Sequence, residues 1–72
     1  MKVRINIDTL SKINAFVAAC SRIYAPVYLI DGEGFKVSAK SLIGAIATMD
    51  WSQVYVECDQ DIYDYIKEFI ER

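Results

Sequence analysis

Polar and apolar residues alternate along four short stretches of the chain, a pattern that gives a strand one apolar face. In the first stretch, Val3, Ile5 and Ile7 alternate with polar residues. Pro26 begins the second stretch, at a position where its missing N–H is tolerated. The pattern predicts strands over residues 2–7, 26–30, 35–39 and 54–58.

Between these stretches the apolar residues recur at intervals of three and four, which is the spacing of an amphipathic helix. Helices are predicted over residues 10–23, from Ser41 to about Met49, and from about Asp59 to Ile70. The solvent side of the last helix is expected to hold Lys67, Glu68, Glu71 and Arg72. The residues expected to face the core are Leu10, Ile13, Phe16, Val17 and Cys20 in the first helix, Leu42, Ala45, Ile46 and Met49 in the second, and Ile62, Tyr65, Ile66, Phe69 and Ile70 in the third.

The predicted elements follow in the order strand, helix, strand, strand, helix, strand, helix. Two glycines in the run 31–34 supply the positive φ of a hairpin turn between the second and third strands. Because every element has one apolar face, the helices are expected together on one side of the sheet, with the other side facing water. The pattern predicts a single α+β domain over residues 1–72, an open-faced two-layer sandwich in which Trp51 covers an edge of the core.

The change from strand spacing to helical spacing falls on Ser41. Its hydroxyl is expected to cap the second helix by accepting a backbone N–H that lacks an intrahelical partner. A phosphate on the same oxygen would meet these N–H groups and the positive end of the helix dipole. Ser41 therefore suits either a purely structural cap or a regulated modification, and the sequence leaves both open.

Residues 36–46, Lys-Val-Ser-Ala-Lys-Ser-Leu-Ile-Gly-Ala-Ile, resemble the segment around the regulatory serine of HPr, the small phosphocarrier of the bacterial sugar phosphotransferase system. The resemblance implies an antiparallel four-stranded sheet in the order 1-4-2-3. It also implies that an HPr kinase phosphorylates Ser41 and that protein partners of the phosphotransferase or catabolite-regulation type dock beside it. The expected docking residues are Lys40, Ile43 and Ala47, although an ordinary scatter of apolar surface residues would look the same.

The chain contains no histidine. In the HPr family a histidine at the start of the first helix carries the phosphoryl group, and the resemblance places Thr9 at that position. A threonine phosphate ester is far more inert than a phosphohistidine, so the chain resembles regulatory paralogues that lack the carrier histidine. Asp8 offers an acyl phosphate as an alternative, but it fits the cap region more simply. The sequence contains no glycine-rich phosphate loop and no pair of carboxylates arranged for catalysis. It therefore predicts no other enzyme activity.

Composition and charge exclude further classes of function. A net charge of −2 and a pI near 4.9 provide no basic surface for nucleic acid or for an anionic membrane. No signal peptide or spanning stretch is evident in the sequence, so a cytoplasmic location is expected. Cys20 and Cys58 lack the spacing of a metal or redox motif and are expected to be buried free thiols. No cofactor or metal is expected.

An alternative function would use the uncovered face of the sheet. Aromatic and basic side chains on an open sheet resemble a platform for single-stranded RNA, although the acidic pI counts against this use. Cross-strand pairing within the chain, or a homodimer contact around Tyr28 and Tyr55, fits the composition better. The residues expected on this face are Tyr28, Ile30 and Tyr55 with Lys2, Arg4 and Lys36.

Overall fold

The computed structural model describes residues 1–71, so that Arg72, expected on the solvent side of the last helix, lies outside the described residues. Within residues 1–71 four strands and three α-helices follow one another in the predicted order. Short 3-10 turns at Thr48–Asp50 and Lys67–Phe69 follow the second and third helices. The elements are β1 (Lys2–Ile5), α1 (Leu10–Cys20), β2 (Tyr28–Ile30), β3 (Lys36–Ser38), α2 (Leu42–Ala47), β4 (Val54–Glu57) and α3 (Tyr63–Ile66).

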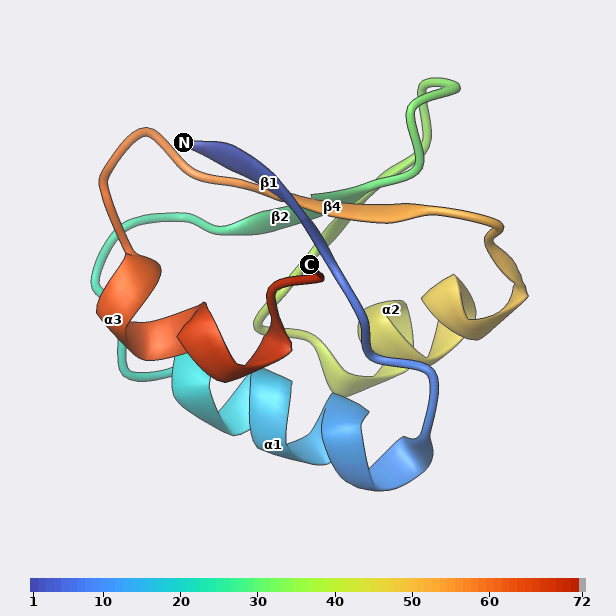
Figure 1. Cartoon of the computed structure of the whole chain (residues 1–72), viewed down its shortest axis with the longest axis horizontal. Coiled ribbons are helices and arrows are strands. Elements are labelled where there is room, and N and C mark those ends of the chain that lie inside the picture. Colours follow the sequence, from blue (N-terminus) through green and yellow to red (C-terminus); the bar gives the residue numbers. More distant parts are fainter. Residues whose placement is uncertain (72) are drawn as a thin grey trace.

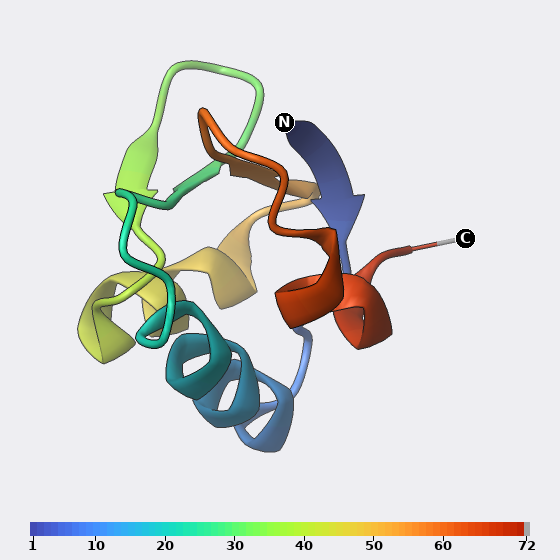
Figure 2. The same cartoon turned by 90° about the vertical axis from the view of Figure 1, so that its left-hand side faces the viewer.

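The strands form one antiparallel sheet in the order β1-β4-β2-β3. Val56 lies in the middle of this sheet, with Val3 opposite it on β1 and Leu29 opposite it on β2. The three helices lie together on one side of the sheet, and no helix of the described chain covers the other side (Figures 1 and 2). The predicted α+β sandwich and its strand order are therefore confirmed.

The core fills the space between the sheet and the helices. Ile13, Phe16 and Cys20 of α1 have no exposed surface, as their helical spacing predicts. The ring of Phe16 meets that of Phe69 edge to face, with ring centres 5.2 Å apart, and this contact joins α1 to the C-terminal segment. Full burial of a side chain of this size stabilises a fold by about 1.5–3 kcal/mol, so Phe16 contributes strongly to the packing energy.

Two helices are shorter than predicted. The first ends at Cys20 instead of about Ile23, because the N–H groups of Arg22 and Ile23 donate to carbonyls only three residues back and form a tight turn. The third begins only at Tyr63, because the Asp61 carboxylate accepts the Tyr63 N–H at 3.0 Å and holds the preceding residues in a turn. A backbone turn therefore sets the first limit and the Asp61 side chain sets the second.

The predicted buried face of the second helix is wrong for three of its four residues. Leu42, Ile46 and Met49 are 42%, 39% and 47% exposed, respectively, whereas Ala45 is fully buried. Thr48, which lies outside the predicted face, is buried and donates its hydroxyl to the Ala45 carbonyl at 2.6 Å. The helix therefore faces the core with small residues and faces outward with large ones.

The close approach of α2 to β3 explains this rotation. A Cβ atom added to Gly44 would lie 3.3 Å from the Cβ of Val37, which is tighter than ordinary van der Waals contact. Glycine allows this close approach without displacing Val37, whereas a larger residue would require its neighbour to shift. Because Gly44 points at β3, the helical period carries the neighbouring Ala45 and Thr48 toward the core and turns the larger side chains away.

Leu10 and Tyr65, also expected in the core, are exposed by 54% and 44%. Leu10 is the first residue of α1, and the buried side of that helix begins one turn later, at Ile13. Ile62, just before α3, and Ile66, at its end, fill the space beneath the sheet, so Tyr65 is left exposed. A short helix has fewer positions that face the core than it has apolar residues, so some of these residues stay exposed.

Trp51 packs half-buried against the core, as predicted for an edge residue. Its ring lies beside that of Phe35 with the centres 6.5 Å apart, although Phe35 itself is 66% exposed. Within residues 1–71 no helix combines the length and the apolar character that crossing a bilayer requires.

Candidate functional site at the start of α2

Ser41 joins β3 to α2 and caps the helix, as predicted. Its backbone is extended, with φ −100° and ψ 118°, and its Oγ accepts the Gly44 N–H at 3.2 Å. Its carbonyl oxygen accepts the Ala45 N–H at 2.9 Å and so begins the helical hydrogen bonds. The residue is exposed, so its hydroxyl is accessible to an enzyme while it acts as a cap.

The turn before Ser41 is held by Ser38. The Ser38 hydroxyl accepts the Lys40 N–H at 3.2 Å, and its carbonyl accepts the Ser41 N–H at 3.2 Å. The Lys40 ammonium donates to the Ile23 carbonyl at 2.6 Å and thereby ties this turn to the chain just after α1. Lys40, expected as a docking residue, is half-buried, and its ammonium is bonded within the chain.

Exposed apolar side chains lie on α2 and on the 3-10 turn that follows it. Ile43 is 83% exposed and Ala47 is also exposed, as expected. Three further side chains that sequence reasoning assigned to the core enlarge this surface. The α2 surface is defined here as the set Leu42, Ile43, Ile46, Ala47 and Met49.

The sequence contains a pattern from which this surface could have been predicted. Gly44, Ala45 and Thr48 are small residues at the spacing of one helical face, and Ser41 precedes them by one turn. A face of small residues suits a helix that approaches a sheet closely, which leaves the large apolar residues for the opposite face. Hydrophobicity alone predicted that the large apolar residues of α2 face the core, which is wrong.

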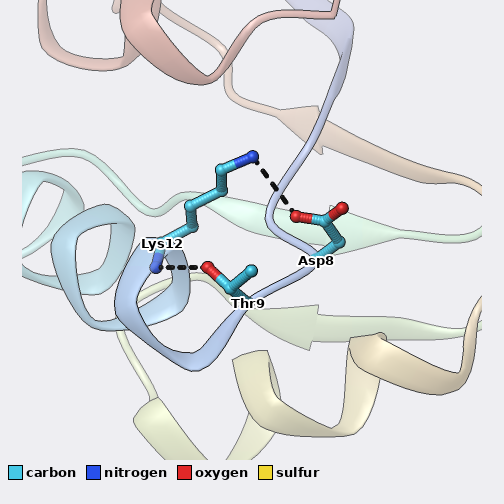
Figure 3. Close-up of polar contacts among 3 residues, drawn as sticks. All are labelled: Asp8, Thr9 and Lys12. Atoms are coloured by element: carbon cyan, nitrogen blue, oxygen red, sulfur yellow. Dashed lines mark hydrogen bonds and ion pairs between the residues drawn. The ribbon is translucent and has the colours of Figure 1, made fainter.

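Thr9, at the position implied for the lost histidine, caps α1. Its Oγ1 accepts the Lys12 N–H at 3.1 Å, and the Lys12 ammonium pairs with the Asp8 carboxylate at 3.2 Å (Figure 3). The Thr9 hydroxyl is therefore engaged as a helix cap, and the Asp8 carboxylate in an exposed ion pair. Both groups have a structural role in the first turn of α1.

The two cysteines are buried free thiols, as predicted. Burial is the main reason that the pKa of Cys20 rises to about 12, and the nearby Lys40 charge offsets only part of that rise. A thiol with so high a pKa stays protonated at neutral pH and is a poor nucleophile. Among residues 1–71 no cluster of three or more histidine, cysteine or acidic side chains is arranged to hold a metal ion.

A hollow of about 650 Å³ lies between the start of α1 and residues 68–71. It is open to solvent and bordered by Lys12, Glu68 and Glu71, among others. Neither Thr9 nor Ser41 lines it. Thr9 and Ser41 are both exposed outside this hollow, where a protein partner can contact them.

On the open sheet face the tyrosine rings are already in contact with lysines of the same chain. The Lys36 ammonium lies 4.4 Å from the centre of the Tyr28 ring and 3.2 Å from the Glu57 carboxylate. The Lys2 ammonium lies 5.4 Å from the centre of the Tyr55 ring. A base stacking on either ring would have to displace an ammonium group, so this arrangement favours cross-strand pairing.

Comparison with protein-family models, with curated proteins and with solved structures gave no match in any of the three. The relation to HPr therefore rests on residues 36–46 and stays a hypothesis.

Proposed function

We propose that this chain is a non-catalytic regulatory module of the HPr type, which binds a protein partner through the α2 surface and is switched by phosphorylation of Ser41. The observation that carries the proposal is the exposed capping hydroxyl directly before a helix whose large apolar residues point outward. The proposal places the chain in the cytoplasm, among partners of the phosphotransferase or catabolite-regulation type.

The switch would act through charge. A phosphate adds roughly −1.5 to −2 charges at neutral pH, and here it would sit beside the exposed Leu42 and Ile43. A partner that offers arginine or lysine near an apolar pocket would gain affinity, whereas a partner with a wholly apolar pocket would be rejected. The absence of histidine leaves the module without phosphohistidine chemistry, so its role would be to signal rather than to relay.

The first test is incubation with an HPr kinase and ATP, followed by mass spectrometry. We expect one phosphate on the chain, none on the Ser41→Ala variant, and an unchanged level on the Ser52→Ala variant, which alters another exposed serine. Authentic HPr serves as the positive control. If HPr is labelled while this chain is not, the regulatory-serine hypothesis is rejected.

The complementary test uses phosphoenolpyruvate and the general phosphotransferase enzyme. Because the chain has no imidazole, we expect no incorporation of phosphate. Acid-labile phosphate on the chain would contradict the non-carrier half of the proposal and would direct attention to Asp8.

A further inference from the structure

We draw no further inference here: the strongest candidate, the hollow on the open sheet face that Lys2 and Lys36 border, has both of its ammonium groups already engaged with residues of the same chain, and nothing in the structure shows what covers it.

Discussion

The hydroxyl groups of Thr9 and Ser41 cap two of the helices beneath the sheet. Each accepts a hydrogen bond from the backbone of its helix. Thr9 accepts the Lys12 N–H and Ser41 accepts the Gly44 N–H, each from the third residue after the cap. The two helices differ in where their large apolar side chains lie. Thr9 precedes a helix that keeps most of them inside, whereas Ser41 precedes one that shows them to solvent.

At this scale a comparison of two substitutions tests whether the Ser41 site tolerates negative charge. Ser41→Ala removes the cap and should lower the free energy of unfolding by about 1 kcal/mol. Ser41→Asp keeps an accepting oxygen and should stay within about 0.5 kcal/mol of the unmodified chain. Urea unfolding monitored by circular dichroism measures both. Equal losses for the two variants would mean that the site does not accommodate an anion.

At the scale of elements, the most informative contact is that between α2 and β3. The helix is six residues long and is anchored to the sheet by Gly44 against Val37 and by the buried Thr48. Because such a short helix has little stability of its own, packing against the sheet decides its orientation. That orientation in turn creates the α2 surface.

A larger side chain at Gly44 should therefore lower the free energy of unfolding. Gly44→Val places a branched side chain where even a Cβ atom would approach Val37 to 3.3 Å, and we expect a loss of about 1–3 kcal/mol through overpacking. Gly34→Val is not a suitable control because its φ of 111° is itself unfavourable to other residues. Ala47→Val, on the exposed side of the same helix, introduces the same side chain and should cost no more than about 0.7 kcal/mol in the same denaturation experiment.

At the scale of the whole molecule, the two-layer arrangement buries one titratable group completely. Cys20 has no exposed surface, and its thiol pKa rises to about 12 in the folded chain from an ordinary value of 9.0. The unfolded chain therefore releases this proton at lower pH than the folded chain does. The thiol leaves stability unchanged below about pH 9 and destabilises the fold as pH rises from there toward 12.

We expect the free energy of unfolding to fall between pH 9 and 12 more steeply for the natural chain than for Cys20→Ala. Other groups titrate in this range, so the difference between the two slopes, and not either slope alone, is the readout. Parallel slopes would show that Cys20 ionises as readily in the folded chain as in the unfolded one.

The α+β class, the order of the elements and the Ser41 cap were predictable, because each depends on residues that are neighbours along the chain. The alternation around Val56 and the helical spacing from Ile13 to Cys20 are local patterns of this kind. The strand order 1-4-2-3 came from the resemblance of residues 36–46 to HPr, and the sheet has that order. The phosphorylation implied for Ser41 stays a prediction.

Local sequence patterns indicate that a helix has an apolar side. They do not determine which side of the helix packs on the sheet. For α2 that choice followed from the closest approach of two backbones at Gly44 and Val37, and it placed Leu42, Ile46 and Met49 outside. Likewise, the pairing of Ile70 with Ile5 that closes one sheet edge joins residues from opposite ends of the chain. Such contacts arise only when separate elements pack together, because their geometry depends on the space that the other elements leave.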